Sequence, residues 1–296
     1  RFQGAERIEI ARADDYERMH AAGVRALVEP SFWLGQPRTG VGSFCDYFDA
    51  LLGWEPFRAA QFGIQHFATI GLNPKEANDA RCREVLGVLP RYLAKDRVVA
   101  VGELGYDSMT PEEDEVFAHQ LVLAVEHDLP ALVHTPHRDK LTGTRRTLDV
   151  VRESGLAPGR VLVDHLNEVT VGVVADSGCW MGFSIYPDTK MDPHRMVAIL
   201  REHGTERMVV NSAADWGRSD PLLTVRTAEA MLAAGFDDDD VDRVLWRNPV
   251  EFYGQSGRLE LDDVAPDAVA TPVAVGAPGT GETFEGNSVL RGSRDG

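Results

Sequence analysis

Long apolar runs and cysteines are scarce in this sequence, and each shortage excludes a class of protein. The chain has 296 residues, and no apolar run in it reaches the ~18 residues that a membrane-spanning helix needs. Its opening residues, RFQGAERIEI, lack the apolar segment of a secretory signal. The three cysteines, Cys45, Cys82 and Cys179, are far apart and have no CxxC spacing. They argue against a disulfide framework or a structural zinc site, and we expect a cytoplasmic protein in which they are small buried residues.

Positive charge is also in short supply. Lysine and arginine total 30 against 47 aspartates and glutamates, which gives a net charge of −17. A negative net charge of this size repels polyanions, so general nucleic-acid binding and adhesion to anionic membranes are both disfavoured. A few arginines can still form a local phosphate pocket. We therefore expect a small-molecule substrate, and the sequence leaves the oligomeric state open.

Short β-branched runs recur along the chain and predict a parallel sheet. Most are nearly continuous apolar stretches, which is typical of strands buried on both faces. A weaker candidate, Arg7–Ile10, opens the chain. The clearer strands are expected at Val24–Glu29, Gln65–Gly71, Val98–Glu103, Ala131–His134, Val161–His165, Gly182–Tyr186 and Met208–Ser212.

Helices with recognisable ends are expected between these strands. Thr110–Glu113 reads as a capping box with proline at the first helical position, and Asp192-Pro193 and Asp220-Pro221 open two further helices. Eight strand-then-helix units in about 255 residues predict a distorted (β/α)8 TIM barrel over residues 1–261. An open doubly wound sheet is the alternative, but no glycine-rich phosphate motif follows the first strand. Residues 262–296, with six glycines and three prolines, predict a flexible or surface-wrapping tail.

Four residues with metal-binding or acid–base side chains stand where apolar runs stop. They are Glu103, His134, His165 and Asp215. In a barrel the carboxyl ends of the strands meet at one mouth, so these side chains are expected to converge. Two imidazoles and a carboxylate with an open position are typical of catalytic zinc, and the set also suits manganese or iron. Taken singly, each residue can also be a solvated cap, a hydrogen-bonded core histidine or an Asx turn.

Basic and aromatic residues follow the same strand ends and are candidate substrate contacts. His137, Arg138, Lys140 and Arg145 follow the expected strand at 131–134, with Arg146 beside them. They suit a phosphate or carboxylate, although a solvated basic face at a helix start is an equal alternative. The other candidates at the mouth are Trp33, Gln36, Arg38, Tyr186, Asp188 and Lys190. For Trp33 and Tyr186, packing beneath a loop is the stronger alternative.

Four strings carry a family resemblance: GELGYD, FAHQLVLAVEHDLPALVHTP, VDHL and WRNPVEFYG. From about Asp14 to Gly254 the chain resembles the TatD-like branch of the amidohydrolase superfamily, and more narrowly TatD-related hydrolases of bacterial ebo-type gene clusters. The resemblance implies a metal-dependent hydrolase with one or two divalent ions, zinc first, with manganese, iron or magnesium as alternatives. Glu103 resembles the carboxylate that bridges two metals, and His134 and His165 resemble the histidines of the second metal. Asp215 resembles the aspartate that binds the first metal and acts as the catalytic base.

One departure from the family pattern concerns the first strand. The family has a HxH pair there, whereas the matching stretch reads Arg7-Ile8-Glu9-Ile10, in which only Glu9 offers an oxygen ligand. A single-metal enzyme, a pseudoenzyme and an altered N-terminus are the three explanations, and the four retained residues favour the first or the third. We expect hydrolysis of a small polar or phosphorylated metabolite. A TatD-type deoxyribonuclease or phosphodiesterase, or an impaired barrel acting as a binding component, are the alternatives.

Overall fold

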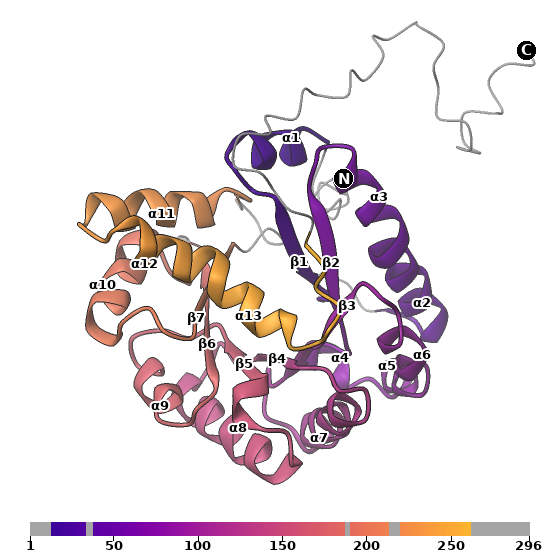
Figure 1. Ribbon diagram of the computed structural model, residues 1–296. Helices are drawn as coiled ribbons and strands as arrows, with labels where there is room; N and C mark the ends of the chain where they lie inside the picture. Colours follow the sequence, from indigo (N-terminus) through magenta and orange to yellow (C-terminus); the bar gives the residue numbers. More distant parts are fainter. Residues whose placement is uncertain (1–12, 34–37, 187–189, 213–219, 262–296) are drawn as a thin grey trace, which may run out of the picture. The chain divides into compact units, whose positions relative to one another are not determined.

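In the part of the chain that the structure describes, seven parallel strands lie in one sheet whose spatial order follows the order of the chain, β1 to β7. The structure is a computed structural model, and it describes residues 13–33, 38–186, 190–212 and 220–261. Helices join consecutive strands and cover the outer face of the curved sheet, which gives a TIM-barrel-like fold (Figure 1). The expected strand Arg7–Ile10 and the expected tail at 262–296 lie outside the described residues.

The strands begin and end within two residues of the positions that the apolar runs predict. The bounds are β1 Ala26–Pro30, β2 Gln65–Ile70, β3 Val98–Gly105, β4 Ala131–His134, β5 Val161–Asp164, β6 Trp180–Ile185 and β7 Met208–Ser212. Every residue of β3 to β6 is buried, as expected for strands covered on both faces. Each parallel pair needs a crossover connection, which the intervening helices supply.

The helices differ widely in length. The long ones are α7 Pro111–Glu126, α8 Lys140–Ser154, α10 Pro193–His203 and α11 Leu223–Ala233. A π-helical segment, Ala50–Trp54, joins α2 to α3, and another, Arg243–Arg247, joins α12 to α13. The shorter helices are α1 Ala13–Ala21, α2 Val41–Asp49, α3 Glu55–Ala60, α4 Pro74–Ala77, α5 Ala80–Arg83, α6 Leu89–Leu93, α9 Val171–Ala175, α12 Asp238–Asp242 and α13 Asn248–Gly254. None of the described helices is long and apolar enough to cross a membrane.

The start of α7 confirms the predicted helix and corrects one detail of its cap. Thr110 Oγ1 accepts from the Glu113 backbone N–H at 3.2 Å, as a capping box requires. The Glu113 carboxylate does not return to Thr110. It accepts instead from the backbone N–H groups of Asp107, Ser108 and Met109 at 2.8 to 3.1 Å. The glutamate therefore fixes the loop between β3 and α7, which begins beside the carboxyl end of β3.

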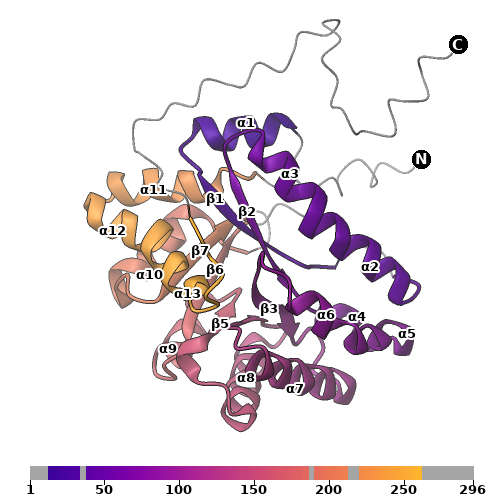
Figure 2. The same ribbon diagram turned by 45° about the vertical axis from the view of Figure 1, so that its right-hand side comes forward.

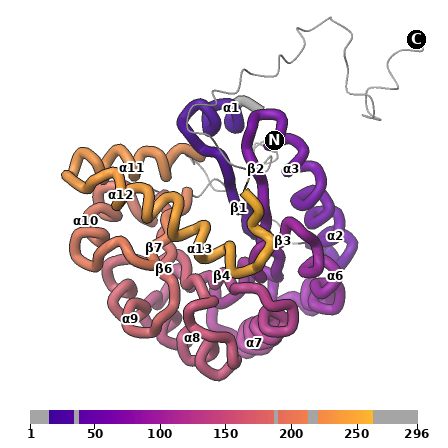
Figure 3. The backbone as a smooth tube through the Cα atoms, in the orientation of Figure 1, coloured from indigo at the N-terminus to yellow at the C-terminus, as the bar shows by residue number. Residues whose placement is uncertain are grey.

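Helix α13 closes one end of the sheet, and Figure 3 shows it lying across the strands. Its Phe252 and Tyr253 pack with the apolar side chains inside the curved sheet, those of Phe67, Val99, Leu132, Leu162, Trp180 and Val209. Just beyond it, Gln255 Nε2 donates to the Gly159 carbonyl and Arg258 Nη1 to the Lys95 carbonyl, both of which precede strands. This end therefore holds the starts of the strands, and their carboxyl ends lie at the other.

A second, larger core fills the space between the sheet and the outer helices. Figure 2 shows α2 and α3 on the outer side of β1 and β2. Phe44 and Phe48 of α2 pack there with Tyr92 of α6 and with Ala68 and Ile70 of β2. Cys82 and Cys179 are buried and unpaired, and Cys45 is half-buried and unpaired. The cysteines are therefore free thiols, as their spacing predicts.

Candidate metal centre

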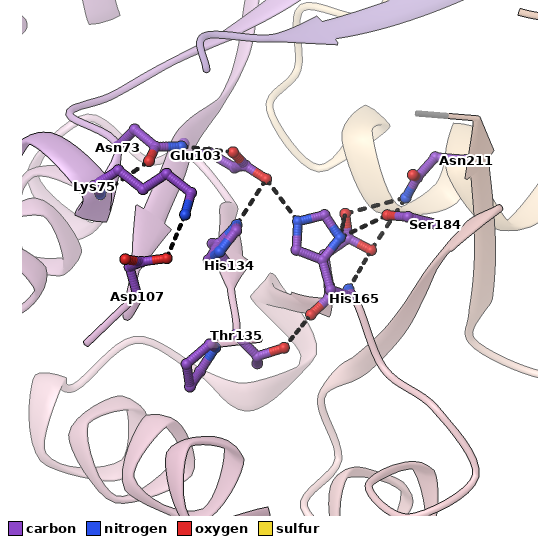
Figure 4. A network of polar contacts seen from close by, with 12 residues as sticks. Asn73, Lys75, Glu103, Asp107, His134, Thr135, His165, Ser184 and Asn211 are labelled. Carbon is purple, nitrogen blue, oxygen red and sulfur yellow. Dashed lines mark hydrogen bonds and ion pairs between the residues drawn. The ribbon is translucent and has the colours of Figure 1, made fainter. Parts of the chain in front are cut away.

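Glu103, His134 and His165 lie together at the carboxyl ends of three neighbouring strands. Glu103 belongs to β3, His134 ends β4, and His165 directly follows β5. The register pairs Gly105 with His134 and His134 with Asp164, so the three side chains reach the same edge of the sheet. Figure 4 shows both imidazoles directed toward the Glu103 carboxylate. The structure thus brings together three of the four residues that the strand ends predict.

A single carboxylate oxygen joins the two imidazoles. Glu103 Oε1 accepts from His134 Nδ1 at 3.3 Å and from His165 Nε2 at 3.1 Å. The two rings are close to perpendicular, with centroids 4.6 Å apart. One nitrogen or oxygen from each residue lies within 4.8 Å of the others, and Glu103 and His134 are buried. Two imidazole nitrogens and one carboxylate oxygen form the donor set of zinc and related metal sites.

Neighbouring amides and hydroxyls fix the orientation of the three side chains. Asn73 Nδ2 donates to Glu103 Oε2 at 2.7 Å, and the Ser184 hydroxyl is hydrogen-bonded to His165 Nδ1 at 2.6 Å. Sequence reasoning missed both residues, because an amide or hydroxyl at a strand end is commonly a helix cap. Asn73 is indeed the N-cap of α4, accepting from the Lys75 backbone N–H at 3.0 Å. The only signal was the position of Asn73 in the short loop between β2 and α4.

The Asp164 carboxylate holds the backbone of His165 in place. Its Oδ1 accepts from the backbone N–H of His165 at 2.7 Å, and Asn211 Nδ2 donates to both of its carboxylate oxygens at 3.1 Å. His165 has a φ of 63°, a left-handed conformation that is uncommon for a residue with a side chain. The Asp164 hydrogen bond therefore stabilises the backbone turn that presents the imidazole to Glu103.

The electrostatics favour an ionised carboxylate beside a neutral imidazole. Burial raises the pKa of Glu103, but the attraction and hydrogen bonds of His134 and His165 outweigh burial and hold that pKa well below its usual range. Burial, assisted by the nearby Lys190 ammonium, lowers the pKa of His165 to about 4. A metal ion binds a carboxylate and an unprotonated imidazole nitrogen. At neutral pH these two ligands therefore already have the charge that metal binding requires.

The predicted substrate contacts separate into different environments. Lys140 lies near the cluster, because its Nζ donates at 3.1 Å to Oγ1 of Thr135, the residue that directly follows His134. Arg146 turns away and pairs with Asp114 of α7. His137, Arg138 and Arg145 are exposed.

The aromatic candidates and the remaining predicted residues also differ in their surroundings. Tyr186 is buried, which suits packing beneath a loop, and Trp33 lies half-buried with the Lys75 ammonium 5.6 Å from its ring centre. Arg38 is buried in an ion pair with Glu76. Gln36, Asp188 and Asp215 lie outside the described residues, so the role of Asp215 stays a prediction.

A TIM-barrel-like sheet with a histidine–carboxylate cluster at the carboxyl ends of its strands defines a class of metal-dependent barrel proteins. Within that class, residues 7–254 match the sequence profile of the family described as TatD related DNase, and the chain belongs to this family. The narrower resemblance to hydrolases of ebo-type clusters stays a prediction.

Curated relatives agree with this assignment. An uncharacterized metal-dependent hydrolase of Methanocaldococcus jannaschii is 22% identical over 249 residues, which cover 83% of this chain and 96% of that protein. An uncharacterized metal-dependent hydrolase, TatD, of Mycobacterium tuberculosis is 34% identical over 150 residues, or 47% of this chain and 53% of that protein.

Solved structures agree on the fold. The TatD-like protein of Archaeoglobus fulgidus superposes with a TM-score of 0.69 at 25% identity, over 82% of this chain and 95% of that one. A lactonase of Listeria monocytogenes superposes with a TM-score of 0.60 at 14% identity, over 85% of this chain and 90% of that one, and this likeness concerns the fold alone.

Proposed function

We propose that the chain is a hydrolase that binds one divalent metal ion through Glu103, His134 and His165 and acts on a small polar or phosphorylated metabolite. The observation that carries the proposal is the convergence of two imidazoles on one ionised, buried carboxylate. When bound at such a site, a divalent ion lowers the pKa of a water molecule to near neutrality and polarises the substrate oxygen. Zinc is our first choice of metal, followed by manganese, iron and magnesium.

The surrounding residues would hold these ligands in place. The Asn73 amide donates a hydrogen bond to the second carboxylate oxygen of Glu103 and so orients the carboxylate. The Ser184 hydroxyl both donates and accepts, so it satisfies His165 Nδ1 in either tautomer and leaves Nε2 free to bind metal. Asp215, predicted from its position after β7, would accept the proton that the attacking water loses.

We infer one ion rather than two from the ligands available. In the part of the chain that the structure describes, Glu103, His134 and His165 are the one group of three such side chains close enough to share an ion. The stretch that matches the family's HxH pair offers only Glu9. A second ion would therefore lack the two imidazoles that the family pattern supplies.

A phosphodiesterase acting on DNA is the second candidate, and the family description TatD related DNase favours it. The net charge of −17 opposes it, because a polyanion is repelled before it reaches the mouth. A binding component without catalysis is the third candidate, and it predicts that no metal binds.

The deciding experiment is the metal content of the protein, measured by mass spectrometry after purification without added metal or chelator. We expect about one equivalent per chain, and loss of that metal in the double variant Glu103→Gln with His165→Ala. The matched control is Glu115→Gln with His119→Ala, on the exposed face of α7, which should keep its metal. Full metal content in the site variant would show that the assignment is wrong. Failure of the wild-type chain to take up metal even on titration would leave the non-catalytic binding protein.

A further inference from the structure

Two lysines lie beside the cluster without a carboxylate partner among the described residues. Lys140, the first residue of α8, has its Nζ 3.1 Å from Thr135 Oγ1 and 3.3 Å from the Pro136 carbonyl oxygen. Lys190 follows β6, and its Nζ lies 3.3 Å from His165 Nδ1. Within the described ranges no Asp or Glu oxygen lies within 4.0 Å of either ammonium. Two ammonium groups without an ion-pair partner among the described residues are unusual in a chain of net charge −17, and surface ion pairing does not explain them.

Both ammonium groups are directed to the same corner of the mouth. Thr135 directly follows His134, and its hydroxyl donates at 2.7 Å to the Asp164 carbonyl, which directly precedes His165. Lys140 therefore approaches the ends of β4 and β5 from the α8 side, while Lys190 approaches His165 from the β6 side. The two charges also interact: after burial, Lys190 is the main influence that lowers the pKa of Lys140 to about 8.

Other cations near the mouth are engaged or solvated. Lys75 pairs with Asp107 at 2.5 Å, and Arg146 pairs with Asp114. Arg138 and Arg145, which the sequence suggests as an anion clamp, are exposed. Arg138 and Arg145 act through water of high dielectric constant, whereas the half-buried ammonium groups of Lys140 and Lys190 are less screened and attract an anion more strongly. The lysines are therefore better placed for a ligand than the arginines.

The metal-binding tautomer of His165 would release Lys190. A lysine ammonium can only donate, so its contact with Nδ1 requires that nitrogen to be unprotonated. When Nε2 serves as a ligand, the neutral ring carries its proton on Nδ1, and the Ser184 hydroxyl accepts that proton. Lys190 then loses this acceptor, and its ammonium becomes available to an anion beside the cluster.

We propose that Lys140 and Lys190 form an anion subsite that holds a phosphate group of the substrate next to the metal cluster. The inference rests on the proposed function, and it narrows the substrate class to phosphorylated small molecules. Two ammonium charges match a doubly charged phosphate better than a singly charged carboxylate. The first turn of α8 adds to this preference, because the Asp139 side chain does not cap its free N–H groups.

The test measures the affinity for inorganic phosphate by titration calorimetry, on the full-length protein as purified and after treatment with chelator. We expect Lys140→Met and Lys190→Met each to raise the dissociation constant about tenfold or more, the loss of one charge-assisted hydrogen bond. The matched control is Lys95→Met, which removes a lysine before β3 at the opposite end of the sheet. Lys140→Gln serves as the second variant if the methionine form does not fold.

The outcomes separate this inference from the proposed function, because metal content is measured on the same samples. Unchanged phosphate affinity in both lysine variants, or acetate binding as tightly as phosphate, would overturn the subsite. Full metal content with lysine-independent phosphate binding would remove the subsite and leave the metal-dependent hydrolase. Lysine-dependent phosphate binding in a chain that takes up no metal would support the subsite and remove the proposed hydrolysis.

Discussion

Glu103 accepts hydrogen bonds from two histidines that lie 31 and 62 positions further along the chain, and from Asn73, 30 positions before it. A buried carboxylate without such partners would be strongly destabilising, and the histidine contacts reverse that penalty. Its environment therefore keeps the carboxylate charged at neutral pH, which is the state that a cation needs.

Ser184 should control metal affinity through His165. We expect Ser184→Ala to weaken zinc binding by about 10- to 100-fold, because the imidazole loses the partner that orients it. The measurement is chelator competition. Ser43→Ala, which removes a hydroxyl bonded to the Gly40 carbonyl at the start of α2, is the matched control and should leave zinc affinity unchanged. Equal affinities for the two variants would refute a positioning role.

Lys140 should make anion binding depend on pH. Its pKa of about 8 results from burial and from Lys190, while Asp164 acts in the opposite direction. The charged form exists below that pKa, so we expect sulfate to bind well at pH 7 and more weakly as the pH rises through 8. Sulfate is suitable because its own charge does not change in this range. Calorimetry at several pH values checks this, and Lys140→Met should abolish the dependence; an equally steep fall in that variant would contradict it.

The sequence predicts the candidate metal ligands but not the residues that orient them. Glu103, His134 and His165 are recognisable because each residue type is a metal ligand and each follows an apolar run. Asn73 and Ser184 are not, since only their three-dimensional contacts distinguish them from ordinary caps and buried hydroxyls.

At the scale of elements, β5 and β6 approach each other closely behind the cluster. A Cβ at Gly182 of β6 would lie 2.6 Å from Asp164 Oδ1 and 2.9 Å from Asp164 Cα. The absence of a side chain at this position therefore lets Asp164 reach the His165 N–H.

Gly182→Ala should consequently affect both stability and the metal centre. We expect a loss of about 1–3 kcal/mol in the free energy of unfolding, because the added methyl overlaps Asp164, and weaker zinc binding through the displaced His165 turn. Gly172→Ala, on the exposed side of α9 with nothing within 4 Å, should instead stabilise by about 0.5–1 kcal/mol. Urea unfolding of the two variants provides the comparison, and a neutral Gly182→Ala would contradict this account.

Element positions follow from sequence more closely than element contacts do. The apolar runs locate β4 and β7 to the residue, whereas one end of β3 and one end of β6 each differ from the expected position by two residues. The Glu113 carboxylate is a contact that the sequence pattern does not predict. The capping pattern locates the start of α7, but the carboxylate binds three backbone N–H groups of the preceding loop instead of the Thr110 N–H.

At the scale of the whole molecule, the acidic charge should decide between small and polymeric substrates. The net charge of −17 repels DNA at long range, while Lys140 and Lys190 attract a single phosphate at short range.

We therefore expect little cleavage of plasmid or single-stranded oligonucleotides with zinc, manganese or magnesium, and more hydrolysis of small phosphorylated esters. Nuclease assays at about 50 and 200 mM salt check this, because repulsion is screened at the higher ionic strength. Efficient cleavage of DNA at both salt concentrations would favour the deoxyribonuclease instead.

The agreement between strand order and chain order has a consequence for synthesis on the ribosome. Each new strand meets a neighbour that has already been translated, so the sheet can grow one unit at a time from the N-terminal side. The ligands at positions 103, 134 and 165 are all translated well before α13, at Asn248–Gly254. In nascent chains that end shortly after β7, we expect zinc to protect the β3–β5 region from protease. The metal centre would then stabilise β3 to β5 in the nascent chain before α13 covers the opposite end of the sheet.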